Sequence, residues 1–230
     1  MRNLILLLLC SVSMLGTLMA QNLLFNGDFE TGDLTGWNPG ADAAINVNVF
    51  NEFAPMPQPA NGSRALKIFG RFNGVQNDNL MFQEHLVSPG DQIDASVEMF
   101  HPSSGLDNLE FKANVAFMRL GFFDAGGAEI DPGIAGVNSD LFSGLNAGDT
   151  WTPFNISATA PAGAVTVQYF LFFIQPLNES GAVFYDNAVL RNITEEQAAA
   201  IPTMSQWALM ILGLIMVSIA VVFIKRRVYA

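Results

Sequence analysis

The chain has 230 residues, 50% of them hydrophobic, a single cysteine and a formal net charge of −11. All 21 acidic residues but only six of the ten basic residues lie between residues 21 and 200, so this part has a net charge of −15. Such a surface argues against nucleic acid as a partner, because phosphates repel it. Calcium, neutral glycans or cationic surfaces remain compatible with it, and so does a charge that serves only solubility.

Residues 1–20 have the pattern of a secretory signal peptide, with Arg2 followed by an apolar run from Leu4 to Cys10. We expect cleavage after Ala20. Cys10 is the only cysteine, so the exported part would contain neither a disulfide nor a thiolate. About 170 residues then remain for one domain, which is enough to bury most of its unfolded surface.

The stretch 22–37, NLLFNGDFETGDLTGW, combines an apolar run, turn residues and acids. Asp28 and Glu30 flank Phe29, so in an extended segment both carboxylates would point to one side and the ring to the other. Calcium takes 6–8 oxygen ligands, far more than two carboxylates supply. The spacing alone therefore leaves open a hard-cation site or an opening strand and loop with solvated acids.

Short apolar or alternating runs predict a series of strands at regular spacing along the domain. They cover residues 65–69, 80–87, 93–99, 111–123, 151–158, 165–174 and 182–190. Residues 41–60 and 131–149 are predicted loops. The first contains three prolines and is interpreted as a binding loop or a stiff surface crossing. With no helical period before Thr194, the pattern predicts an all-β sandwich or jelly roll.

Three segments resemble the family 4/9 carbohydrate-binding modules, which are galactose-binding-like jelly rolls. They are residues 22–37, 82–99 (FQEHLVSPGDQIDASVEM) and 160–190, which ends in GAVFYDNAVL. The resemblance implies a jelly-roll β-sandwich over residues 21–192. It also implies a structural Ca²⁺ between the first and last strands, held by Glu30, Asp186 and the backbone carbonyl of Asp28. A further ligand is expected near residues 61–63.

A sugar site needs aromatic faces for ring hydrogens and fixed polar groups for hydroxyls. Phe170 and Phe172 fall on one side of a predicted strand whose other side suits a core. Five residues are singled out as candidate sugar contacts: Arg71, Gln83, Gln168, Phe170 and Phe172. The alternative is core filling, since 19 phenylalanines stand against three tryptophans and three tyrosines.

Motifs for catalysis are missing from the sequence: there is no GxSxG, Walker A loop, HExxH or cysteine ligand set. We therefore predict a protein that is not an enzyme. A glycoside-active enzyme, or the accessory module of one, is a minor alternative.

Residues 207–224 form an uncharged run of 18 residues, which would be about 27 Å long as a helix and could span a bilayer. The basic tail at 225–227 predicts a cytoplasmic C-terminus, with the domain outside. Residues 193–200 are a predicted linker between the domain and this segment.

Just before the run, Ile201, Pro202, Thr203 and Trp207 belong to the sequence IPTMSQW. It resembles the IPTLxxWG motif of IPTL-CTERM sorting signals, which exosortase-type membrane transpeptidases of Gram-negative bacteria process. The sequence departs from that motif at Met204 and Ala208. The resemblance implies a sorting signal over residues 201–230, and an ordinary single-pass anchor is the alternative.

These features together predict an exported cell-surface protein of a Gram-negative bacterium. It would be anchored in the inner membrane until processing. Its predicted role is non-catalytic binding of a glycan, such as the cell's own exopolysaccharide. The competing hypothesis is a structural matrix or adhesion protein that uses the same fold for protein–protein contacts.

Overall fold

The computed structural model describes residues 21–41, 46–53, 56–59, 61–70, 76–177, 179–194, 210–218, 220 and 224. The chain divides into a unit at Ala20–Thr194 and a second unit formed by Met1–Met19 and Glu195–Ala230. In the second unit, residues 210–218 are helical. Within the described residues, no helix is both long and apolar enough to cross a membrane. The predicted signal peptide, Arg71 and the motif at 201–207 lie outside the described residues.

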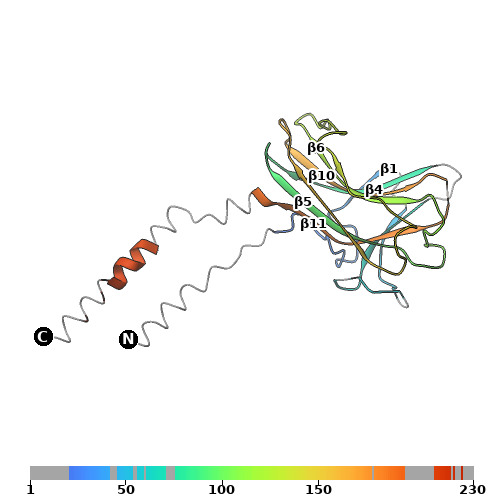
Figure 1. Ribbon diagram of the computed structural model, residues 1–230, viewed down its shortest axis with the longest axis horizontal. Helices are drawn as coiled ribbons and strands as arrows, with labels where there is room; N and C mark the ends of the chain where they lie inside the picture. The colour runs from blue at the N-terminus through green and yellow to red at the C-terminus, as the bar shows by residue number, and fades with distance from the viewer. Residues whose placement is uncertain are drawn as a thin grey trace. The chain divides into compact units, whose positions relative to one another are not determined.

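The first unit is a sandwich of two antiparallel sheets, as the sequence predicts (Figure 1). Sheet A has the order β1-β4-β10-β6-β7, and β8 also pairs with β6. Its strands are β1 (Asn38–Ala41), β4 (Asn77–Leu86), β6 (Val115–Phe123), β7 (Val137–Asn138), β8 (Phe142–Ser143) and β10 (Thr166–Gln175). Sheet B has the order β2-β3-β11-β5-β9. Its strands are β2 (Val47–Phe50), β3 (Ala65–Phe69), β5 (Gln92–Phe100), β9 (Thr152–Thr159) and β11 (Ala182–Asn192).

The main core lies between the sheets and follows from strict alternation along the long strands. On β10 the buried inward positions are Val167, Tyr169, Leu171 and Phe173. On β5 they are Ile93, Ala95, Val97 and Met99. Because successive side chains on a strand point to opposite faces, this pattern leaves every second residue of each strand on the outer face of its sheet.

Two buried tyrosines tie the sheets together through their hydroxyl groups. Tyr169 on sheet A donates to the Ser96 carbonyl on sheet B, with an O–O distance of 2.9 Å. Tyr185 on sheet B donates to the Phe172 carbonyl on sheet A at 2.5 Å. Burial raises the pKa of both tyrosines well above 10, so both keep the proton that they donate. The core therefore satisfies these polar groups across its two layers.

A second apolar cluster covers the outer face of sheet B. Phe53 is only 1% exposed and packs against the rings of Phe100, Phe184 and Trp151, at centroid distances of 5.7–6.5 Å. Phe53 lies in the segment after β2, so this part of the predicted 41–60 loop is a packed layer rather than a surface crossing.

The loop predictions for 41–60 and 131–149 are wrong where the chain forms short strands. Val47–Phe50 forms β2, and Val137–Asn138 and Phe142–Ser143 form β7 and β8. These strands are two to four residues long and are held by edge pairing, which leaves no run long enough to detect by alternation. The strand predicted from residue 111 begins instead at Val115, because Phe111 adopts a positive φ of 60° in a loop.

We expect Phe53→Ala to lower the free energy of unfolding by about 3–5 kcal/mol, because it empties the centre of the second cluster. Denaturant unfolding followed by circular dichroism measures this change. Phe111→Ala is the matched control: this ring is fully exposed, so its loss should change stability by less than about 0.5 kcal/mol. Equal effects of the two substitutions would contradict the packing role of Phe53.

Candidate functional site

The N-terminal segment, defined here as residues 22–37, is joined to the end of β11. The Leu23 N–H donates to the Leu190 carbonyl at 2.8 Å, and the Ala188 N–H donates to the Gly27 carbonyl at 2.9 Å. A Cβ atom at Gly27 would lie 2.2 Å from the Ala188 carbonyl oxygen, so only glycine permits this approach. The two ends of the domain therefore meet in one place.

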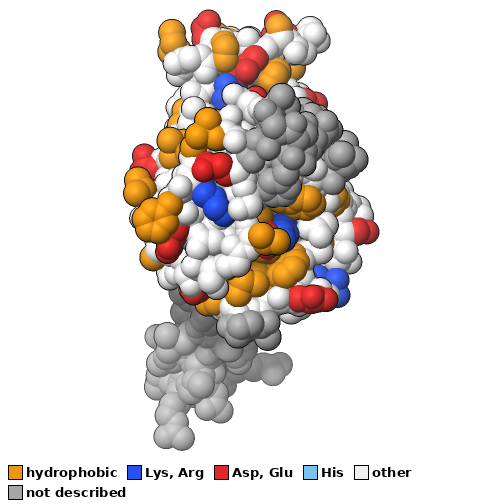
Figure 2. Space-filling model, turned by 90° about the vertical axis from the view of Figure 1, so that its right-hand side faces the viewer, with side chains coloured by type: hydrophobic (Ala, Val, Ile, Leu, Met, Phe, Trp, Pro, Cys, Tyr) orange, Lys and Arg blue, Asp and Glu red, His pale blue; other side chains and the backbone are white. Residues whose placement is uncertain are grey.

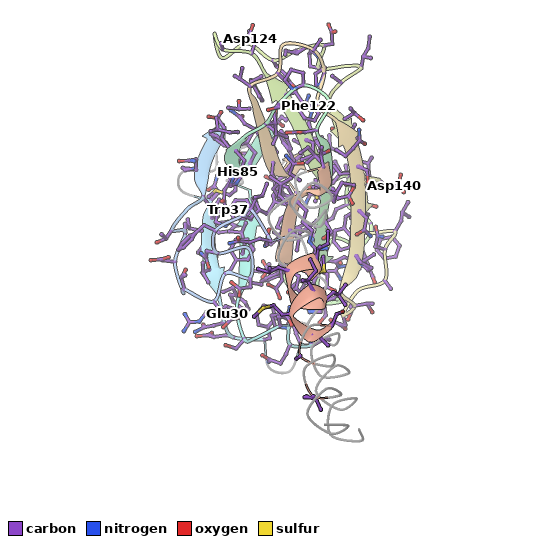
Figure 3. All side chains as sticks on the ribbon, turned by 90° about the vertical axis from the view of Figure 1, so that its left-hand side faces the viewer. Glu30, Trp37, His85, Phe122, Asp124 and Asp140 are labelled. Carbon is purple, nitrogen blue, oxygen red and sulfur yellow. The ribbon has the colours of Figure 1, made fainter. Side chains whose placement is uncertain are left out.

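The same segment is anchored in the core by aromatic packing. Phe29 is fully buried and stacks on Trp37, with ring centroids 5.3 Å apart. The Trp37 indole N–H donates to the Asn26 carbonyl at 3.0 Å. Figure 3 labels Glu30 and Trp37, which lie on the same flank of the sandwich in that view. Because φ is positive at Phe29, the segment is a turn and not the extended strand considered from its sequence.

Asp186 is a buried acid at an irregularity of β11. The register to β5 shifts between Asp186 and Val189, and Asn187 has a positive φ of 51°. Asp186 is 0% exposed, and neither of its carboxylate oxygens makes a geometrically good hydrogen bond to any described residue. An unpartnered buried carboxylate is costly when ionised, which marks this position as one that requires explanation.

Burial raises the pKa of Asp186 to about 8. The backbone N–H of Asn187 opposes this shift, and the negative charges of Glu98, Glu30 and Asp28 add to it. These four acids therefore form one electrostatic group, here called the acidic cluster. None of them lies within ion-pair distance of a lysine or arginine among the described residues.

Glu30 is held by the segment that precedes β3. Its Oε1 atom accepts hydrogen bonds from the backbone N–H groups of Ser63 and Arg64, both at 2.7 Å. Gly62 has a φ of 75°, and a Cβ atom there would lie 2.3 Å from the Glu30 carboxylate. This close approach explains the glycine in the Asn61-Gly62-Ser63 sequence, where a further ligand is expected.

Asn187, next to Asp186, joins Glu98 of the acidic cluster to Asn61. Its Oδ1 accepts from the Asn61 Nδ2 at 2.6 Å, and its Nδ2 donates to the Glu98 Oε2 at 2.9 Å. Glu98 is also the register partner of Asp186 on β5. Of the predicted metal ligands, Asp28 and Glu30 act electrostatically on Asp186. Among the described residues, no group of three or more His, Cys, Asp or Glu is placed so that it could hold a metal ion.

The outer face of sheet A carries a continuous group of aromatic side chains, here called the phenylalanine face. It consists of Phe82 on β4, Phe117 and Phe123 on β6, and Phe170 and Phe172 on β10. Phe117 and Phe172 are register partners whose rings stack at 4.8 Å with an interplanar angle of 12°. The Phe170 ring packs against the rings of Phe82 and Phe172, with centroid distances of 5.7 and 5.6 Å. Phe170 is 9% exposed, and the other four are half-buried.

Charged and amide groups border the phenylalanine face. The Arg119 guanidinium lies 5.8 Å from the Phe170 ring centroid and forms an ion pair with Glu129. The Gln168 Nε2 donates to the Glu84 Oε2 at 2.7 Å. The face therefore combines flat apolar rings with hydrogen-bonding groups, which is what a polyhydroxylated ring requires.

The structure brings three of the predicted sugar contacts, Gln168, Phe170 and Phe172, to this face. Gln83 points to the opposite side of β4 and is 4% exposed. Its amide donates to the Phe25 carbonyl at 2.8 Å and accepts from the Phe25 N–H at 3.1 Å, so it holds the N-terminal segment. Phe117 and Arg119 were not predicted as contacts, although their alternate positions in the 111–123 run place them on one face.

Two parts of the chain resemble known proteins. Residues 199–227 match the IPTL-CTERM motif, so this predicted signal is confirmed. No curated protein matches the chain.

Solved structures resemble the β-sandwich at low identity. One is the enzymatically active domain of tailspike protein 4 from bacteriophage CBA120, with a TM-score of 0.55, 13% identity and 74% of this chain covered. This chain spans only 21% of that protein. Another is TmCBM61 in complex with β-1,4-galactotriose, with a TM-score of 0.50, 16% identity and coverage of 75% of this chain and 99% of that one. A family 16 carbohydrate-binding module has a TM-score of 0.45 and 17% identity, with coverage of 74% of this chain and 99% of that one.

These identities show a shared fold and nothing more. The β-sandwich of this chain is one that carbohydrate-binding modules also have, as the sequence resemblance implies.

In the presence of a chelator, we expect stability to fall as the pH rises from about 4 to about 8. The unfolded Asp186 ionises near 3.8 while the folded form keeps its proton until about pH 8. Over this window the folded state binds one more proton than the unfolded state. The free energy of unfolding therefore falls by up to about 1.4 kcal/mol per pH unit as the pH rises. Denaturant unfolding at a series of pH values measures the slope. Asp186→Asn should flatten it, and an unchanged slope in that variant would contradict the assignment.

Proposed function

We propose that this protein is exported to the bacterial cell surface and binds carbohydrate without catalysis, through the phenylalanine face of sheet A. The observation that carries this proposal is the set of five phenylalanines on one outer sheet face, bordered by Arg119, Gln168 and Glu84. The solved complex of TmCBM61 with β-1,4-galactotriose, on a similar fold, supports a glycan as the class of ligand.

The chemistry of the face suits a sugar chain. The stacked rings of Phe117 and Phe172 offer an apolar surface against which the C–H groups of a pyranose ring can pack. Phenylalanine has no polar group, so the hydroxyl contacts fall to the bordering side chains. Gln168 and Glu84 form one such pair, and Arg119 supplies further N–H donors beside its ion pair with Glu129.

The acidic cluster is proposed to hold a structural Ca²⁺. Calcium prefers hard oxygen ligands, and the two unpartnered oxygens of the buried Asp186 fit this preference. The Glu30 side chain and the Asp28 carbonyl would add to the ligand set, with backbone or water oxygens for the remainder. The ion would supply the positive charge that these acids lack, and would fasten the N-terminal segment to β11.

Export and sorting complete the proposal. Residues 1–20 act as a signal peptide, and residues 207–224 span the inner membrane with the basic tail in the cytoplasm. An exosortase-type transpeptidase of a Gram-negative bacterium then processes the chain near the motif, which leaves the domain at the surface. The match of residues 199–227 to the IPTL-CTERM motif supports this sequence of events. The cell's own exopolysaccharide is the proposed glycan.

A second candidate is a matrix or adhesion protein that contacts other proteins. The observation in its favour is a group of almost fully exposed apolar loop residues: Leu106, Phe111 and Leu145 are 83%, 100% and 98% exposed. Figure 2 shows hydrophobic side chains at the surface among acidic and basic ones on one end of the sandwich. Such side chains are a feature of protein interfaces.

We expect the full chain to be retarded in native gels that contain a soluble polysaccharide, tested over a panel of neutral and acidic glycans. Phe172→Ala should weaken the retardation at least tenfold, because it removes half of the stacked pair. Phe111→Ala is the control and should bind as the native chain does. Absence of retardation by every glycan, with the fold intact, would contradict the proposal. Loss of self-association in Phe111→Ala would then favour the second candidate, and release of reducing sugar would indicate an enzyme.

Calcium is expected to raise the melting temperature of the protein, and EDTA to lower it again, because the ion binds only the folded state. Asp186→Asn should remove the difference between the two conditions. Asp140→Asn, at an exposed acid that Figure 3 labels away from Glu30, should preserve it. A melting temperature that is insensitive to EDTA in the native chain would rule out the calcium proposal.

A further inference from the structure

A pocket of about 380 Å³ opens on the outer side of sheet B, at the edge formed by β2 and β3. Its lining residues are Asn48, Lys67, Phe69, Leu106, Asp107 and Ser180. Lys67 and Phe69 are alternate residues of β3, and Asn48 is the register partner of Lys67 on β2. The phenylalanine face belongs to sheet A, so this pocket is separate from the proposed glycan site.

An aromatic cage holds the Lys67 ammonium group at the base of the pocket. Its Nζ atom lies 5.4, 5.7 and 5.4 Å from the ring centroids of Phe50, Phe69 and Phe184. It donates to the Asp107 Oδ2 at 2.6 Å. The two side chains are 17% and 30% exposed, so the ion pair is held in place yet reachable from solvent.

Several polar groups of the pocket are unused. The second carboxylate oxygen of Asp107, the Asn48 side-chain amide and the Ser180 hydroxyl make no hydrogen bond to any described residue. Beside them stand the Phe69 ring and Leu106, whose side chain is 83% exposed. A pocket with an apolar wall and a few converging polar groups has the composition of a ligand site, and its volume is within the usual range of about 300–1,000 Å³.

We propose that this pocket is a second carbohydrate site, which takes a single neutral sugar residue. Its ring would pack on Phe69 and Leu106, with neighbouring hydroxyls between the free Asp107 oxygen, the Lys67 ammonium and the Asn48 amide. The ligand is neutral because the charge of Lys67 is already balanced by Asp107. An anionic sugar would have to displace that carboxylate on a domain that is itself strongly acidic.

The sugar residue belongs to a longer chain. A neighbouring hollow of about 550 Å³ shares Leu106 and Asp107 with the pocket and continues along Pro102, Asp149 and Met56. This inference extends the proposed function, because sites on the outer faces of two different sheets allow one domain to hold two glycan chains at once. Such bivalency raises the avidity for a polysaccharide network beyond that of either site.

The test is a titration of the full chain, in zwitterionic detergent solution, with glucose, galactose, mannose and xylose at millimolar concentrations. Two-dimensional ¹H–¹⁵N spectra follow the backbone amides. We expect at least one sugar to shift the amides of Asn48, Phe69, Asp107 and Ser180 in a saturable manner. Glucuronate should shift them at least tenfold less at equal concentration.

Three variants identify the site. Asn48→Ala, at an exposed side chain, and Asp107→Asn should each weaken the saturable shift at least tenfold while the remaining spectrum is preserved. Phe172→Ala should leave it unchanged, because that ring lies on the other sheet. Absence of a saturable shift with all four sugars would overturn the inference, and so would native affinity in both pocket variants. Retardation by polysaccharide in native gels that survives either result would show that the proposed function stands without this pocket.

Discussion

The buried carboxylate of Asp186 is the constraint around which the rest of the domain is arranged. It is fully enclosed, lacks a good hydrogen-bond donor and lies among three other acids. A buried charge without a partner opposes folding, so this position demands either a proton or a cation. The irregularity of β11 at this point also frees the Ala188 N–H to reach Gly27. The buried Asp186 carboxylate therefore lies next to the backbone hydrogen bond that joins the first and last segments of the domain.

The two outer faces of the sandwich differ in how they are covered. The segment after β2 lies over sheet B and inserts Phe53 among aromatic rings, which turns that face into a second core. Sheet A keeps its phenylalanine face half-exposed. Because of this asymmetry, the rings on sheet A stay partly open to solvent, while a similar number of rings on sheet B are packed into a second core. The pocket beside Lys67 lies at the margin of the covered face, where the layer leaves polar groups in reach of solvent.

The strands that the sequence predicts correctly are the long ones with strict alternation. β5 and β10 have one apolar face and one mixed face, and the mixed face of β10 already identifies Phe170 and Phe172 as outward residues. The strands that the sequence missed and the wrong prediction for Gln83 have the same cause. β1, β2, β7 and β8 exist through pairing with longer neighbours, and the orientation of Gln83 depends on its contacts with the Phe25 backbone. The residues of a short segment do not specify such distant partners.

The sequence by itself determined the all-β class, the alternation that builds the core and the IPTL-CTERM motif. Each of these is a property of neighbouring residues or of a short contiguous pattern. Only the tertiary structure decided that acids from β11, β5 and the N-terminal segment form one electrostatic group, and that rings from three strands form one face. Those arrangements depend on register and on contacts between residues that are distant in the chain, which no local pattern specifies.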